Sequence, residues 1–163
     1  MILVRNEKIR CRYFHIHKLN RAWRIHFSLC LLESVPGSPG YCNGFTLGSH
    51  GAYFIDRNST KNIQFPYSDY SAHYCLGIIY DRTLKSELDE TKIYSVGEVE
   101  TITSVISNLQ YFLVEKWKIA SDKPGSGNTA NIGSIDHIEE ILQGKGMFSL
   151  LGEQWFDDYW MNY

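Results

Sequence analysis

The histidines of the N-terminal segment are the residues whose type and spacing best suit chemistry. His15 and His17 lie in the alternating stretch RYFHIH, and His26 lies in a second stretch of similar character, RIHFSLCLL. A short polar break separates the two stretches, which is the pattern of a β-hairpin. If Lys18 pairs with Trp23 across the turn, His15 lies opposite His26. The three imidazoles would then share one face of a two-stranded ribbon.

This ribbon face could support two kinds of catalytic site. Imidazole transfers protons near neutral pH, so His15 and His26, assisted by Tyr13 and Arg24, could serve a small hydrolase or nuclease. His15, His17 and His26 could also converge on a zinc ion and leave one coordination position open. Alternation along any polar strand face produces the same spacing. We therefore predict a solvated or partner-facing surface, with no catalytic residue, no bound metal and no cofactor.

The glycine-rich segment 124–134 is compared with nucleotide-binding loops. Gly125, Gly127 and Gly133 follow an expected helix and lack the GxGxxG spacing of a dinucleotide loop. No lysine follows Gly133, as a Walker loop would require. The segment is therefore expected to be a connector or a loop that contacts a partner.

Charge and hydropathy limit the classes of function. The 163 residues carry a net charge of -2, with basic residues concentrated near the start and acidic residues near the end. A nucleic-acid-binding domain usually has a strongly basic surface, so we predict that nucleic acid is an unlikely partner. No apolar run approaches the roughly 18 residues of a membrane span. We expect a cytoplasmic protein that does not interact with membranes.

Aromatic and acidic residues interleave near the C-terminus, a composition that suits an interface with a basic partner. The alternative is that the aromatic residues close the core as a terminal helix. We expect the first arrangement and assign partner binding to Glu139, Glu140, Glu153, Trp155, Asp157, Asp158 and Trp160.

The expected elements give an α+β fold. An antiparallel sheet from the N-terminal half packs against a long amphipathic helix, about 96–119, followed by one or two short helices. Ser95 and Glu98 form a capping box for the long helix, and a short helix is expected at 135–143. The whole chain, 1–163, reads as a single domain that is strand-rich over 1–85 and helix-rich over 95–163. Strands are expected near 8–18, 22–32, 45–47, 52–56, 63–65 and 73–80.

In its small size, mild acidity, lack of a recognisable catalytic motif and aromatic-acidic C-terminus, the chain resembles the small immunity proteins of bacterial polymorphic and contact-dependent toxin systems. The resemblance implies a protein-binding inhibitor that neutralises a toxin, such as a nuclease, by covering its basic active site. The partner would then be a basic toxin domain. Two alternatives stay open, the histidine-dependent hydrolase or nuclease and a structural or adaptor subunit that self-associates through a sheet edge.

Overall fold

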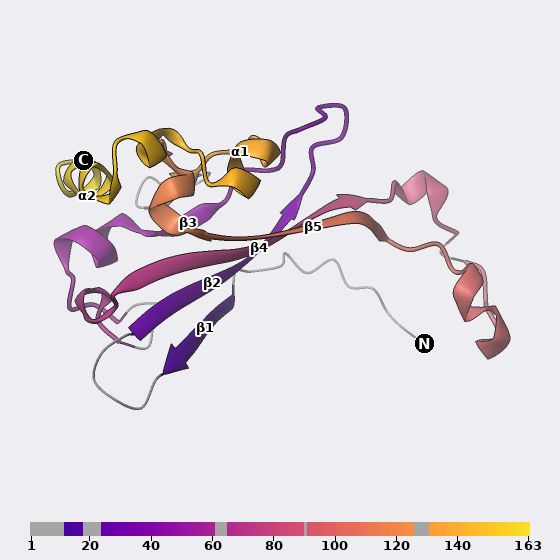
Figure 1. Cartoon of the computed structure of the whole chain (residues 1–163). Coiled ribbons are helices and arrows are strands. Elements are labelled where there is room, and N and C mark those ends of the chain that lie inside the picture. The colour runs from indigo at the N-terminus through magenta and orange to yellow at the C-terminus, as the bar shows by residue number, and fades with distance from the viewer. Residues whose placement is uncertain (1–11, 18–23, 61–64, 90, 126–130) are drawn as a thin grey trace.

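The computed structural model describes residues 12–17, 24–60, 65–89, 91–125 and 131–163 (Figure 1). Two sheets and several short helices make up this part of the chain. The strands are β1 (Arg12–His17), β2 (Arg24–Glu33), β3 (Thr46–Ser49), β4 (Ala72–Arg82), β5 (Ile106–Glu115), β6 (Ala120–Pro124) and β7 (Asn131–Ser134). The α-helices are α1 (Ile138–Gln143) and α2 (Glu153–Met161). Short helices of other types are η1 (Gly51–Ile55), η2 (Tyr67–Asp69), η3 (Lys85–Glu87), η4 (Val96–Thr101), η5 (Lys116–Ile119) and η6 (Met147–Leu150).

The first two strands form the antiparallel hairpin that the sequence predicts. His15 pairs with His26 and Tyr13 with Ser28, so the predicted register is confirmed. The expected residues 8–11 of the first strand lie outside the described residues. Because the register fixes which side chains share a face, it also determines which histidines lie opposite one another.

The larger sheet has the order β1-β2-β4-β5 and is mixed. Its central pair, β2 and β4, is parallel, whereas the other two pairs are antiparallel. The prediction of a wholly antiparallel sheet is therefore wrong, although the α+β class is confirmed. Both central strands have apolar residues on their two faces, as in LCLL of β2 and CLGII of β4. This composition is typical of parallel strands, and the chain between them is long enough for the crossover.

The predicted long helix over 96–119 does not form. The segment contains the short turn η4, the ten-residue strand β5 and the turn η5. The capping pair is present, since the Glu98 carboxylate accepts a hydrogen bond from the Ser95 backbone N–H at 2.9 Å, but it closes only η4. Pairing with β4 along most of β5 satisfies the backbone and outweighs the local three-to-four-residue spacing of apolar side chains.

The smaller sheet has the order β3-β7-β6. It includes the glycine-rich segment, whose two ends are strands and not the loop that the sequence predicts. Strand β3 lies close to the expected residues 45–47, but the expected strand 52–56 is instead the π-helical turn η1. The predicted helix 135–143 is confirmed in shorter form as α1, and Gly144 ends it in the left-handed conformation at φ 61°. The expected strand 63–65 lies mostly outside the described residues.

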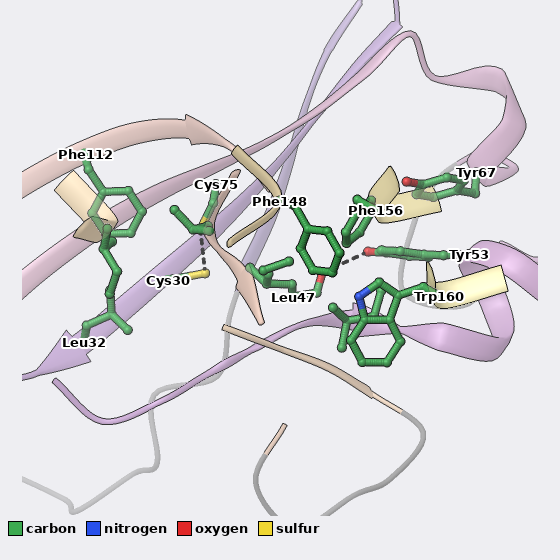
Figure 2. Packing of buried hydrophobic residues seen from close by; sticks show 14 of the residues in the cluster. Cys30, Leu32, Leu47, Tyr53, Tyr67, Cys75, Phe112, Phe148, Phe156 and Trp160 are labelled. Atoms are coloured by element: carbon green, nitrogen blue, oxygen red, sulfur yellow. Dashed lines mark hydrogen bonds between the residues drawn. The ribbon is translucent and has the colours of Figure 1, made fainter. Parts of the chain in front are cut away.

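The C-terminal helices and the smaller sheet lie over one face of the larger sheet, whereas β4 and β5 extend beyond the body toward η3 and η4 (Figure 1). Aromatic side chains fill the space between the layers, with Phe148, Phe156, Trp160 and Tyr53 close together (Figure 2). Cys30, Cys42 and Cys75 are buried free thiols, and Cys11 lies outside the described residues. Among the described residues, no helix has the length and apolar character needed to cross a membrane.

Candidate functional site

A hollow of about 350 Å³ opens beside the hairpin of β6 and β7. We call it the hairpin hollow. Its apolar wall includes Phe45 and Ile135, and its polar groups come mainly from the two strands of the hairpin. The residues that line it are Gly44, Phe45, Ser121, Asp122, Lys123, Pro124, Gly125, Gly133, Ser134, Ile135 and Asp136.

Close backbone packing shapes the base of this hairpin. A β-carbon on Gly133 would lie 2.5 Å from the Lys123 carbonyl oxygen, so this position has no room for a side chain. The Gly125 N–H donates to the Asn131 carbonyl at 2.8 Å, which holds the two strands together at the ends of their described parts. Glycine is thus needed at position 133 for the approach of one backbone to another.

Side chains tie the hairpin to the rest of the fold. The Ser134 hydroxyl accepts a hydrogen bond from the Phe45 N–H at 3.0 Å. The Tyr159 hydroxyl donates to the Asp122 carbonyl at 2.7 Å, linking α2 to β6. Lys123 is exposed, and Asp122 is half-buried. The hollow therefore combines a fixed backbone frame with hydroxyl, carboxylate and ammonium groups that can contact a polar ligand.

A second polar group of residues lies inside the protein, and we call it the interior cluster: His26, Tyr53, His73 and Lys116. The Lys116 ammonium lies 2.9 Å from the Tyr53 hydroxyl and 3.3 Å from Nδ1 of His26. Lys116 is only 4% exposed and His26 is fully buried. The ring of His73 lies 5.2 Å from that of His26 and stacks on Tyr67 with 4.0 Å between centroids.

Burial shifts the ionisation of this cluster and its neighbours. Burial chiefly, with the nearby charges of Lys116 and His26, holds the pKa of His73 well below its ordinary value. The backbone of Tyr67 acts in the opposite direction. Burial also raises the pKa of Tyr67. His73 is therefore neutral near pH 7, and Tyr67 keeps its proton.

The β2 part of the predicted histidine face is not a solvated surface. Its β2 members His26 and Ser28 point into the core, at 0% and 3% exposure. The side chains of Tyr13, His15, His17 and Arg24 lie outside the described part of the structure, so the catalytic and zinc hypotheses that include them stay predictions. Within the residues that the structure describes, no group of three or more His, Cys, Asp or Glu could hold a metal ion.

The residues assigned to partner binding divide between surface and core. The exposed ones are Glu139, Glu140, Glu153, Trp155 and Asp158. Trp160 is fully buried, contrary to the expectation that it faces outward, and Asp157 is half-buried. Burial raises the pKa of both Glu153 and Asp157, and a neighbouring carboxylate acts in the same direction on each. One face of helix α2 thus packs against the core and the other is exposed to solvent, as in an amphipathic helix.

The comparison with known protein families decides what kind of protein this is. The family model described as restriction endonuclease EcoRV matches residues 34–163. The chain belongs to the EcoRV restriction endonuclease family. The type II restriction enzyme EcoRV of Escherichia coli is 44% identical over 122 residues, which are 73% of this chain and 47% of that enzyme. The chain thus spans about half the length of the curated relative that it matches.

Membership of the EcoRV family overturns the resemblance to toxin-immunity proteins. The inhibitor function, the basic toxin partner and the exclusion of nucleic acid are wrong. The nuclease alternative is closer, although the histidines suggested it for a different reason. General features such as small size and mild acidity are shared by many families, so they could not distinguish these two.

Sequence reasoning missed Lys116 and undervalued the glycine-rich hairpin. The buried position of Lys116 depends on Tyr53 and His26, which are distant in sequence, so no local signal indicates it. The hairpin had a usable signal, since Gly125 and Gly133 flank a polar segment and a glycine within a strand indicates a close backbone approach.

Proposed function

We propose that this chain binds duplex DNA, as a DNA-contacting part of a restriction endonuclease. The observation that carries the proposal is the family match over residues 34–163, which includes the whole of the smaller sheet and the hairpin hollow. The E. coli relative is named as a restriction enzyme, a class of enzyme that acts on DNA. The hairpin of β6 and β7 is the candidate element for the contact.

The shape of this hairpin supports the proposal. The major groove of B-DNA admits a two-stranded β-ribbon, and β6 and β7 form such an antiparallel pair. Hydroxyl, carboxylate and amide groups read base edges by hydrogen bonds, and the hollow provides the first two from Ser121, Asp122 and Asp136. The backbone contacts around Gly133 give the ribbon a defined geometry before it meets DNA.

The charge of the chain limits how DNA is held. A net charge of -2 gives little general attraction to phosphates, so base contacts should contribute a large share of the affinity. Lys123 is the exposed cation of the hollow and lies beside Asp122 in sequence. We therefore assign Lys123 to a phosphate contact that positions the hairpin.

The test is a binding measurement with labelled duplexes of randomised sequence, selected on the purified chain and read by fluorescence anisotropy at several salt concentrations. We expect selection to enrich a defined sequence. Lys123→Ala should weaken binding to all sequences about equally and reduce the slope of log affinity against log salt by about one. Lys145→Ala, an exposed lysine outside the hollow, is the matched control and should change neither.

Absence of duplex binding at low salt by the folded chain would contradict the proposal. Equal effects of Lys123→Ala and Lys145→Ala would remove the hairpin hollow from the contact. The same duplexes with added Mg²⁺ report phosphodiester cleavage. Because the chain spans 47% of the E. coli relative, the proposal assigns DNA binding to this part and leaves phosphodiester cleavage as an outcome of the test.

A further inference from the structure

The interior cluster joins elements that are far apart in sequence. His26 comes from β2, Tyr53 from η1, His73 from β4, and Lys116 is the first residue of η5. Residues 116–119 lead directly into β6, so the Lys116 ammonium lies at the point where the larger sheet passes into the smaller one. Any change that repels this ammonium acts on the joint between the two sheets.

The contact between Lys116 and His26 requires an unprotonated imidazole nitrogen. An ammonium group has only donors, so Nδ1 of His26 must accept at the observed distance of 3.3 Å. A proton on Nδ1 would remove that acceptor and place two positive charges against each other in a site with little water. At such a separation and low dielectric, like charges repel strongly.

His73 is a second buried imidazole whose protonation would be unfavourable. Both of its ring nitrogens are buried, and neither makes a hydrogen bond of good geometry with the described residues. A cavity of about 10 Å³, room for about one water molecule, lies between His73, Lys116 and Glu153. A proton taken up by His73 would find an acceptor in the Tyr67 backbone but would face the charge of Lys116.

The groups that face His73 come from every element packed around it. They are Lys116 from η5, His26 from β2, Tyr53 from η1, Tyr67 from η2, Tyr70 just after η2, Arg57 from the segment after η1, and Glu153 from α2. The tyrosines are uncharged near neutral pH, and Lys116, His26 and Arg57 all disfavour a proton on His73. Glu153 is the carboxylate of the cavity wall, and because its pKa is raised it loses its charge early on acidification.

We propose that His26 and His73, packed against Lys116, make the joint between the two sheets acid-sensitive, so that proton uptake by these imidazoles opens it. The direction follows from linkage. A histidine that is neutral in the folded state and has an ordinary pKa of about 6.5 when unfolded stabilises the fold above that pH. This contribution is lost progressively as the pH falls below about 6.5.

The test is urea unfolding of the whole chain between pH 5.5 and 7.5. Well below pH 6.5, each such histidine should lower the folding equilibrium constant up to tenfold per pH unit. His73→Phe removes one titrating group and keeps a ring that can stack on Tyr67. It should reduce the slope of the logarithm of the folding equilibrium constant against pH by up to one. His137→Phe, at a half-buried histidine that contacts Tyr41 outside the cluster, is the control and should keep the slope of the parent.

If His73→Phe does not fold, the ring signals of the parent protein by nuclear magnetic resonance give the same answer. His26 and His73 should stay neutral until the protein opens. A stability that is flat over this pH range, an unchanged slope in folded His73→Phe, or imidazoles that protonate within the folded state would each overturn the proposal. Because these measurements contain no DNA, their outcome is independent of the proposed function.

Discussion

Lys116 of the interior cluster and the β6 residues of the hairpin hollow lie only a few residues apart along the chain, on either side of residues 117–120. Both contain a lysine and hydroxyl groups, yet Lys116 is buried while Lys123 is exposed. In the cluster the polar groups contact one another, so they contribute mainly to the stability of the fold. In the hollow they face open space, so their effect falls on binding. The comparison shows that the surroundings of a lysine, and not its type, decide its role.

The largest effect is expected from the apolar wall of the cluster. Phe156 is 4% exposed and lines the small cavity beside Lys116. Phe156→Ala should lower the free energy of unfolding by about 3 to 5 kcal/mol, measured by urea titration, because a large buried ring leaves a cavity. Trp155 is its neighbour on α2 and is 58% exposed, so Trp155→Ala should stay within about 0.5 kcal/mol. Equal losses of unfolding free energy in the two variants would contradict the conclusion that Phe156 faces the core and Trp155 faces solvent.

A smaller effect is expected when one acceptor is taken from the cluster. Tyr53→Phe removes the hydroxyl that accepts from Lys116 at 2.9 Å and leaves a buried ammonium with one partner fewer. We expect the free energy of unfolding to fall by about 1 to 3 kcal/mol. Tyr111→Phe, at a 64% exposed residue of β5, is the control and should cost almost nothing. An unchanged stability of Tyr53→Phe would show that the cluster is not as dry as its burial implies.

The smallest effect on stability is expected at the hairpin, where binding should respond more than folding. Gly133→Ala places a methyl group 2.5 Å from the Lys123 carbonyl oxygen, so the two strands must separate. Unfolding should become easier by on the order of 1 kcal/mol, and duplex DNA binding should weaken several-fold. Gly44→Ala is the matched control, because its β-carbon would meet no atom within 4 Å although Gly44 lines the same hollow. If Gly133→Ala bound DNA as well as the parent protein, the close packing of β6 on β7 would not be needed for DNA binding.

Sequence patterns predicted the local elements better than their surroundings. The hairpin register through His15 and His26, the strand β4 and the end of α1 at Gly144 follow from alternation and from a glycine that tolerates positive φ. The sequence predicts a helix over residues 106–115 because the apolar residues there recur every three or four positions. Only one of them, Phe112, is buried. The segment is an edge strand of the larger sheet, and its apolar side chains do not form the buried stripe of a helix.

The candidate site was less predictable than the fold. A net charge of -2 gave an argument against nucleic acid that applies to the whole surface, whereas a β-ribbon needs only a local set of polar groups. The aromatic-acidic C-terminus suggested an interface, but Trp160 packs inside with Tyr159 and Tyr163 around it. Large aromatic side chains stabilise the core by burial, and their sequence spacing does not say which of them stay exposed.

By itself, the sequence determined the pairing of β1 with β2, the position of β4 and the end of α1 at Gly144, because these depend on neighbours along the chain. Only the tertiary structure decided that the His26 face turns inward, that β2 and β4 run parallel, and that Lys116 is buried while Lys123 is not. The physical reason is that burial and strand pairing between distant segments involve more free energy than local propensity. Their partners, such as Tyr53 for Lys116, are brought together only by the complete fold.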